Sequence, residues 1–204
     1  YLNTINKTWV LSRLAIEMED MPKAYDKFYV ETWVDDAMKY FTSRNFKVVS
    51  ESGHIYGYGK SVWALIDTGT REPSDIFAIR EGLINEYIEK GYICPIGKSS
   101  RVKITDKASL PRSIDTYYSD VDVNGHINSV KYIEHIFDLW DLDWFLQHTI
   151  KRLEIAYVAE SHQGDRLHFY REQRDSDLDF NVGITKSNEF CEETETCRCR
   201  VLFV

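Results

Sequence analysis

The feature of this sequence that most restricts its fold is an internal repeat. Residues 13–16 read RLAI, and residues 152–155 read RLEI. Thirteen positions after each arginine, the segments DKFYVETW and DRLHFYRE begin with an acid and a base and continue as β-rich runs. The run SVWALI at 61–66 matches RVLFV at 200–204 at the same separation as Arg13 and Arg152. Three matches at one separation favour a duplicated structural unit over chance similarity between strands.

Each half of the repeat is expected to consist mostly of strands. Four segments in each half carry the β-branched and aromatic residues that are typical of strands. They are TWVLSRLAIEM, KFYVETWV, FKVVS and KSVWALID, followed by RLEIAYVAE, DRLHFYRE, LDFNVGI and CRCRVLFV. ESG at 51–53 predicts a hairpin turn, and SNEF at 187–190 is its counterpart. The segment IREGLINEYIEKG at 79–91 predicts a short helix that Gly91 ends.

The two halves differ at their starts. In the second half, the segment 112–151 precedes Arg152 and includes a stretch with helical periodicity, whereas only the segment 1–12 precedes Arg13. The first unit is therefore expected to lack its opening strand and helix, so that the given chain begins partway into a domain. Between the halves, Pro95, Gly97 and Pro111 predict an irregular or extended junction.

The composition excludes several classes of protein. The 204 residues carry a net charge of −8, so nonspecific binding to nucleic acid or to anionic membranes is not expected. No apolar run approaches the ~18 residues of a membrane span, and no signal peptide is visible. The four cysteines form no paired zinc-binding pattern. These features predict a reduced, cytoplasmic, globular protein.

The stretch SDVDVNGHINSVKYIEHI at 119–136 places an acid, an amide and an imidazole at alternate positions. In an extended segment, the side chains of Asp122, Asn124 and His126 would point to the same side. Gly125 allows a turn and the close approach of a substrate, and Asn128 is a good N-cap for the helix that follows. The expected apolar face of that helix is Val130, Ile133, Ile136, Phe137 and Trp140.

Such a group of residues suits attack on a carbonyl. Amide, imidazole and backbone donors can stabilise an oxyanion, and the free N–H groups at the helix N-terminus favour developing negative charge. A carboxylate can activate water or attack directly. The same residues also fit a turn followed by a capped helix, and the pattern alone leaves both interpretations open.

The stretch also resembles the DxNxHxNxxxY segment of the plant and bacterial acyl-acyl carrier protein thioesterases. The segments TWVLSRLAIE, SVWALID and IAYVAES are similar to segments of that family in the same order, so the resemblance spans nearly the whole chain. It implies an α+β fold of two tandem hot-dog domains, each an antiparallel sheet curled around a helix. The expected divisions are an N-terminally incomplete hot-dog domain at 1–90, a linker at 91–111 and a catalytic hot-dog domain at 112–204.

The resemblance further implies a catalytic site in the second domain. Asp122, Asn124 and His126 match the motif, and Glu160 in YVAES matches a glutamate of the family. The next position is often cysteine in plant members but is Ser161 here, and a serine without an evident base is a poor nucleophile. We therefore favour a carboxylate mechanism. In it Asp122 attacks or acts as a base, Asn124 and His126 orient it and stabilise the oxyanion, and Glu160 holds and activates water.

The repeat predicts a single active site. At the separation that aligns Arg13 with Arg152, Met21 corresponds to Glu160 and Pro22 corresponds to Ser161. The first half therefore lacks the acid, and catalysis is expected only in the second half.

The implied reaction releases a free fatty acid from acyl carrier protein, without a cofactor or a metal ion. An apolar tunnel for the acyl chain is expected in the first domain. Trp9, Leu11 and Trp63 are candidate lining residues, although ordinary core positions would look the same. An acidic carrier protein requires a local basic patch on an acidic enzyme.

Two basic patches are candidates for carrier docking. The junction at 91–112 has one acid and five basic residues, namely Lys98, Arg101, Lys103, Lys107 and Arg112. Lys151 and Arg152 form the other candidate. A solvated linker is an equally good interpretation of the junction.

Other functions on the same fold stay open. An acyl-CoA thioesterase would use the same chemistry with another carrier. A non-catalytic acyl-binding protein is disfavoured because all four matched catalytic positions are retained. A hot-dog dehydratase is disfavoured because no HxxxxGxxP-type segment is present, and the six histidines form no metal-ligand motif. A homodimer is compatible with the sequence.

Overall fold

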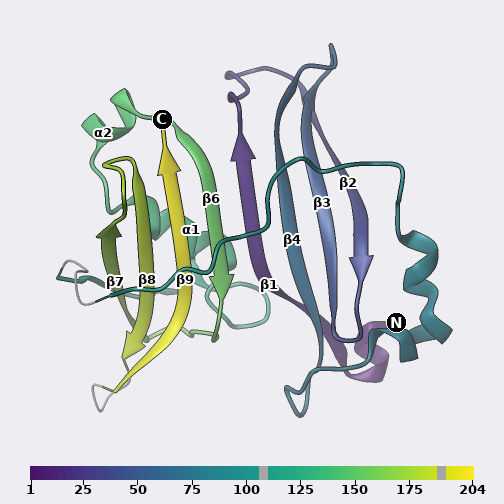
Figure 1. Ribbon diagram of the computed structural model, residues 1–204. Helices are drawn as coiled ribbons and strands as arrows, with labels where there is room; N and C mark the ends of the chain where they lie inside the picture. The colour runs from purple at the N-terminus through teal and green to yellow at the C-terminus, as the bar shows by residue number, and fades with distance from the viewer. Residues whose placement is uncertain (106–109, 188–191) are drawn as a thin grey trace. The chain divides into compact units, whose positions relative to one another are not determined.

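The computed structural model describes residues 1–105, 110–187 and 192–204 (Figure 1). The chain divides into two compact units, Tyr1–Ser99 (unit 1) and Ser100–Val204 (unit 2). Over the described ranges, no helix combines the length and the apolar character that crossing a membrane requires.

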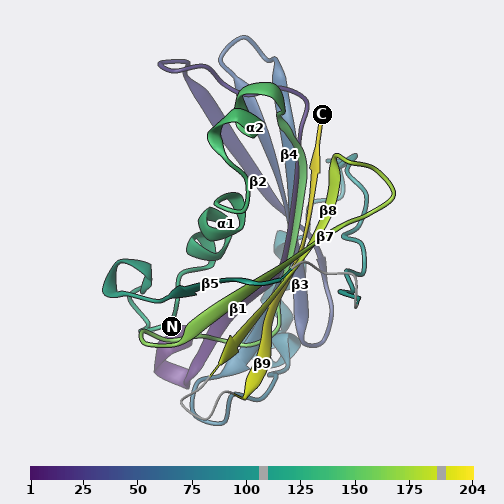
Figure 2. The same cartoon turned by 90° about the vertical axis from the view of Figure 1, so that its left-hand side faces the viewer.

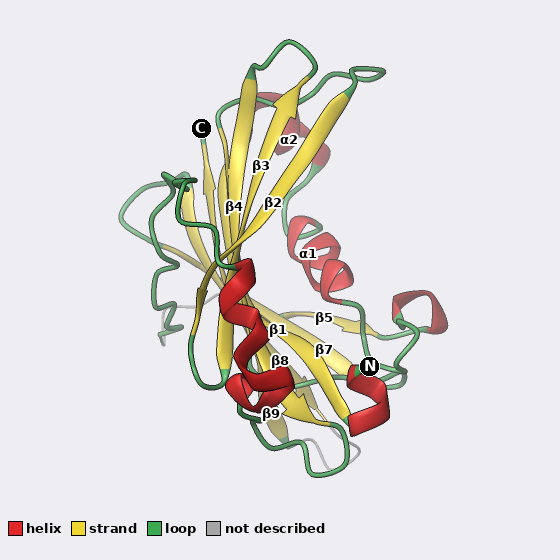
Figure 3. Ribbon diagram, turned by 90° about the vertical axis from the view of Figure 1, so that its right-hand side faces the viewer, coloured by secondary structure: helices red, strands yellow, loops and turns green. Residues whose placement is uncertain are grey.

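Unit 1 contains a four-stranded antiparallel sheet (Figure 3). After the short 3₁₀ helix η1 (Leu2–Ile5), its strands are β1 (Lys7–Met18), β2 (Phe28–Ala37), β3 (Phe41–Ser50) and β4 (Ile55–Asp67), in the order β2-β3-β4-β1. Each strand overlaps its predicted segment. The predicted turn at 51–53 is confirmed, because Gly53 adopts φ +88° and its N–H donates to the Ser50 O atom at 3.1 Å.

The segment after β4 differs from the predicted helix at 79–91. It forms the 3₁₀ helix η2 (Ile76–Tyr87), which non-helical residues interrupt from Ile79 to Gly82. Arg80, Glu81 and Gly82 all have positive φ, so a regular right-handed helix cannot continue through them. Beyond η2 the chain reaches the edge of β2, where the Glu89 N–H donates to the Val34 O atom at 2.9 Å.

Unit 2 contains a five-stranded antiparallel sheet with helices on one side (Figure 2). Its strands are β5 (Arg112–Asp115), β6 (Ile150–Tyr157), β7 (Arg166–Gln173), β8 (Asp179–Ser187) and β9 (Glu193–Phe203), in the order β6-β9-β8-β7-β5. Between β5 and β6 lie the 3₁₀ turn η3 (Tyr118–Asp120) and the helices α1 (Ser129–Phe137) and α2 (Leu142–Gln147). The predicted turn at 187–190 falls largely on 188–190, outside the described residues.

The strands confirm the internal repeat. The shift that places Arg13 of β1 on Arg152 of β6 also aligns the other strands of the two units. When β2, β3 and β4 are moved by this shift, each begins one position after its counterpart β7, β8 or β9. Both units also share one strand order, because β2-β3-β4-β1 corresponds to β7-β8-β9-β6. The repeat in the sequence is therefore a repeat of topology.

Helix α1 packs against the inner face of the unit 2 sheet. The Tyr132 ring lies 6.0 Å from the ring of Tyr157 on β6, and the His135 ring lies 6.2 Å from the ring of Phe169 on β7. The expected apolar face is correct at Ile136, which is fully buried, but wrong at Val130, which is 55% exposed. Tyr132, one turn before Ile136, is buried instead, because its ring contacts the Tyr157 ring on the sheet.

Trp140 is buried as expected, but it lies beyond the end of α1. Its ring centroid is 5.2 Å from that of Phe180 and 5.1 Å from that of Phe203. These edge-to-face contacts close one end of the core of unit 2. The Arg171 guanidinium of β7 also lies over the Trp140 ring, 5.2 Å from its centroid.

Residues 100–105, here called the strap, cover the outer face of the same sheet. The Ser100 N–H donates to Glu154 Oε2 at 2.6 Å, and the Thr105 N–H donates to Glu172 Oε2 at 3.1 Å. Between these ends, Ile104 packs over Gly183 of β8, where a Cβ atom would meet Ile104 Cγ1 at 2.5 Å. Glycine at 183 therefore allows the strap to lie close to the sheet.

Candidate active site

The polar trio lies in a tight turn rather than in the extended segment predicted from alternation. Val121 and Ile127 form a β-bridge across the base of this turn. Gly125 adopts φ +84°, a conformation that other residues rarely take. The prediction of an extended backbone was wrong, because an aspartate carboxylate can accept the main-chain N–H two residues later and stabilise a turn.

The Asp122 carboxylate organises the turn. Its Oδ1 atom accepts the Asn124 N–H at 2.8 Å and the His126 N–H at 3.2 Å. Its Oδ2 atom lies 3.4 Å from Asn124 Nδ2. Burial by itself would raise the pKa of Asp122. The main-chain hydrogen bonds and the Asn124 amide outweigh burial and hold this pKa below its ordinary value.

His126 faces the carboxylate of Glu160, which is distant in sequence. His126 Nε2 lies 3.4 Å from Glu160 Oε2, and the two side chains keep 28% and 36% of their surface exposed. A half-exposed imidazole beside a carboxylate can accept or deliver protons while a substrate or water reaches it. The structure therefore brings together His126 and Glu160, which sequence reasoning had linked only through the family resemblance.

The N-terminus of α1 is capped as predicted. Asn128 Oδ1 accepts the Val130 N–H at 2.9 Å, and the Asn128 O atom accepts the Lys131 N–H at 2.9 Å. These bonds occupy two amides of the first turn. The expectation that this turn offers free N–H groups is therefore wrong for Val130 and Lys131.

Ser161 lies directly after Glu160 and is fully buried. Its main-chain O atom accepts the Ile127 N–H at 2.8 Å, which ties the segment after β6 to the turn. The Ser161 hydroxyl and the phenol of nearby Tyr132 are both buried without a hydrogen-bond partner among the described residues, and burial raises the pKa of Tyr132. A protonated phenol is a poor base, so this neighbour does not activate the serine.

Two residues near the site were not predicted from the sequence. The His162 ring lies edge-on to the His126 ring, with 5.1 Å between their centroids. Lys186 Nζ donates to the main-chain O atom of Glu160 at 2.8 Å. The position of His162 two residues after Glu160 could have suggested its proximity. Lys186 gave no local signal, because it is 26 residues from Glu160.

The candidate acyl-chain residues lie in unit 1. Leu11 pairs with Trp63 across β1 and β4, and Trp9 pairs with Leu65. Paired residues of antiparallel strands share a face, so Trp9, Leu11 and Trp63 form one half-buried surface. Their role in binding the acyl chain stays a prediction.

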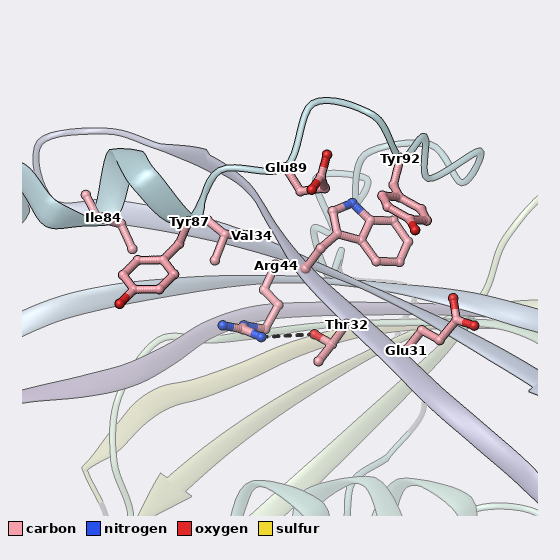
Figure 4. A pocket seen from close by; sticks show the side chains of 9 residues that line it. Glu31, Thr32, Val34, Arg44, Ile84, Tyr87, Glu89 and Tyr92 are labelled. Carbon is pink, nitrogen blue, oxygen red and sulfur yellow. Dashed lines mark hydrogen bonds between the residues drawn. The ribbon is translucent and has the colours of Figure 1, made fainter.

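A separate groove of about 820 Å³ lies at the edge of β2 in unit 1 (Figure 4). The aromatic rings of Trp33, Tyr87 and Tyr92 contribute to its lining. Arg44 and Thr32 also line the groove, and the Arg44 guanidinium donates to Thr32 Oγ1 at 3.1 Å. Trp9, Leu11 and Trp63 do not belong to this lining.

Family models match both units of the chain. The family model of the acyl-ACP thioesterase N-terminal domain matches residues 1–86, and that of the C-terminal domain matches residues 104–203. The crystal structure of an acyl-ACP thioesterase from Bacteroides thetaiotaomicron is 44% identical, with a TM-score of 0.89. The match covers 100% of this chain and 79% of that chain.

Plant proteins are similar at lower identity. The 12:0-ACP thioesterase from Umbellularia californica shares the fold at 21% identity, with a TM-score of 0.86 over 100% of this chain and 77% of that chain. The chloroplastic palmitoyl-acyl carrier protein thioesterase of Gossypium hirsutum is 27% identical over 187 residues. That match covers 90% of this chain but 45% of the relative, so the chain spans less than half of its length. The predicted architecture of two tandem hot-dog domains is confirmed by the fold of the matched structures.

Proposed function

Because the chain belongs to the acyl-ACP thioesterase family, we propose that it hydrolyses the thioester of a fatty acyl group carried by acyl carrier protein. The observation that carries this proposal is the contact between His126 Nε2 and Glu160 Oε2 at 3.4 Å. It joins an imidazole and a carboxylate beside a turn whose Asn124 side chain is exposed.

In the proposed reaction, Glu160 and His126 activate a water molecule. The water oxygen attacks the thioester carbonyl carbon while its proton passes to this pair. The tetrahedral oxyanion then collapses, the C–S bond breaks, and the thiolate of the carrier takes up a proton. The products are a free fatty acid and the carrier thiol.

Asp122 orients the site in this proposal. Its lowered pKa keeps it ionised, which makes it a weak base at neutral pH, and its Oδ1 atom already accepts two main-chain N–H groups. Asn124 is exposed, and its amide nitrogen carries two N–H groups, of which one suffices for the contact with Asp122. The other can donate to the oxyanion. Direct attack by Asp122 is the alternative that substitution separates.

The strap supports docking of an acidic carrier on unit 2. Val102 is buried while Arg101 and Lys103, on either side of it, are exposed, so both cations face solvent. Arg152 is a weaker candidate because its Nε atom is bound to Glu154 at 2.6 Å. Lys107 lies outside the described residues. A cytoplasmic location and a homodimer stay predictions from the sequence.

The decisive experiment compares one acyl group on two carriers. The same fatty acyl thioester is supplied on acyl carrier protein and on coenzyme A, and kcat/KM is measured for the parent, Glu160→Gln and His126→Ala. We expect preference for the protein carrier, with losses of about 10²–10⁴-fold in both variants. Glu134→Gln is the matched control, because Glu134 pairs with Lys131 on the exposed side of α1. Equal single-turnover hydrolysis by all four proteins would contradict the proposal.

A further inference from the structure

Lys186 brings a cation to the inner face of the unit 2 sheet. It follows the buried Ile184 on the same face of β8, and its side chain is only 25% exposed. Its Nζ atom donates to the Glu160 O atom at 2.8 Å and lies 3.2 Å from Asp165 Oδ2. The lysine therefore binds both ends of the loop at 160–165.

Main-chain bonds hold the other sides of this loop. The Val158 N–H donates to the Thr196 O atom at 2.7 Å, and the Ser161 O atom accepts from Ile127 at 2.8 Å. Neither bond involves the peptide oxygen of Glu160 itself. The side chain of Lys186 donates to that oxygen at 2.8 Å.

Asp165 keeps Lys186 in place. Its Oδ2 atom also accepts the His162 N–H at 2.9 Å, so one carboxylate oxygen joins the lysine to the loop. Thr116 Oγ1 lies within hydrogen-bond distance of the main-chain O atoms of His162 and Asp165, at 2.9 and 2.8 Å, and its single O–H can donate to either. These bonds close the loop, and Lys186 joins its end at Asp165 to the main-chain O atom of Glu160 at its other end.

From this geometry we infer that Lys186 is a positioning residue for Glu160, with Asp165 as its anchor. The inference rests on the proposed hydrolytic function. Lys186 fixes the Glu160 peptide, and this peptide fixes the direction in which the carboxylate points toward His126. Loss of the lysine lets the peptide rotate and moves the carboxylate away from its working position, although the loop retains its main-chain bonds.

Substitution at 186 tests the inference through kinetics. A displacement of about 1 Å can lower a rate by about 10²-fold, so Lys186→Met is expected to lower kcat by about 10- to 100-fold with little change in KM. Lys186→Arg retains a donor and the charge and is expected to restore most of kcat. Lys131→Met is the matched control, because Lys131 is 31% exposed and pairs at 2.7 Å with Glu134 rather than with the loop.

A double variant separates positioning from a general structural role. If Lys186 acts through Glu160, adding Lys186→Met to Glu160→Gln lowers the residual rate little further. A loss in the double variant equal to the product of the two single losses would overturn the inference. So would a Lys186→Met protein with the parent kcat.

A measurement without substrate keeps the test independent of the proposed function. In NMR spectra at one pH, Lys186→Met and Glu160→Gln are expected to shift the ring resonances of His126, whereas Lys131→Met leaves them in place. Unchanged His126 resonances in a folded Lys186→Met protein refute the positioning role. If these resonances shift but the parent hydrolyses no thioester, the proposed function fails and the positioning of Glu160 stands.

Discussion

Replacement of Asp122 distinguishes a carboxylate that orients the site from one that reacts. In the structure, Asp122 Oδ1 accepts two main-chain N–H groups, at 2.8 and 3.2 Å. Asp122→Ala removes both bonds. Asp122→Asn retains a carbonyl oxygen that can accept them but removes the charge.

The expected magnitudes follow from these two bonds. Hydrogen bonds to a charged group contribute about 1.5–3 kcal/mol each when buried. Asp122 is half-buried and Asn124 is exposed, so water replaces part of the loss in the alanine variant. We therefore expect Asp122→Ala to lower the free energy of unfolding by about 2 kcal/mol in total. Neutral bonds are about half as strong as charged ones, so Asp122→Asn should lower it by about 1 kcal/mol.

The effect on activity should follow the effect on the turn. A change of about 2 kcal/mol corresponds to about a 30-fold change in an equilibrium population. The expected kcat of Asp122→Ala is therefore lower by at least about 30-fold, whereas Asp122→Asn retains roughly a tenth or more of the parent value. The assays are urea unfolding and hydrolysis of an acyl-carrier thioester at saturating substrate.

One result would refute this reasoning. If Asp122→Asn keeps the parent free energy of unfolding but is as inactive as Glu160→Gln, the charge of Asp122 takes part in the reaction. Asp122 would then be the attacking group or the base, and Glu160 would have the supporting role.

Three further outcomes are expected. Ser161→Ala should retain most of kcat in the same hydrolysis assay, because the neighbour of the Ser161 hydroxyl is a phenol whose pKa is raised by burial. An inactive but folded Ser161→Ala protein would assign Ser161 a chemical role. Gly183→Ala should lower the free energy of unfolding in urea by about 1–3 kcal/mol, because the alanine Cβ would overlap Ile104. An unchanged urea midpoint would mean that the strap lies farther from the sheet. Hydrogen bonds outweigh the burial of Asp122 and lower its pKa. The ionised carboxylate therefore stabilises the folded protein above the ordinary carboxyl pKa of about 3.9, and this contribution is lost as the pH falls through the lower pKa of the folded state. Unfolding measured between pH 2 and pH 6 should show a smaller acid loss in Asp122→Asn than in the parent, and the loss that remains comes from other carboxyl groups of lowered pKa, such as Glu154 and Glu193.

The sequence by itself determined the arrangement of strands. Strand propensity is a local property of β-branched and aromatic runs, so the eight predicted segments overlap eight strands, and the constant separation between the two halves predicted that the second half repeats the strands of the first. The cap at Asn128 was also predictable, because capping joins residues only two positions apart.

Several features depended on which groups meet in three dimensions. Alternation predicted an extended trio, but the Asp122 carboxylate bound nearby N–H groups and formed a turn. Helical spacing placed Val130 in the core, but the position of the sheet selected Tyr132. Positive φ values at Arg80 and Glu81 interrupted the segment that its composition favoured as a helix.

The assembly of the site was decided by tertiary structure. Glu160 reaches His126 because the Ser161 O atom binds Ile127, and Lys186 reaches Glu160 because β8 ends beside the loop that follows β6. Propensity and periodicity describe each segment relative to its own neighbours in the chain. Hydrogen bonds between distant segments depend on where the folded sheet brings their ends together, and a linear pattern does not contain those distances.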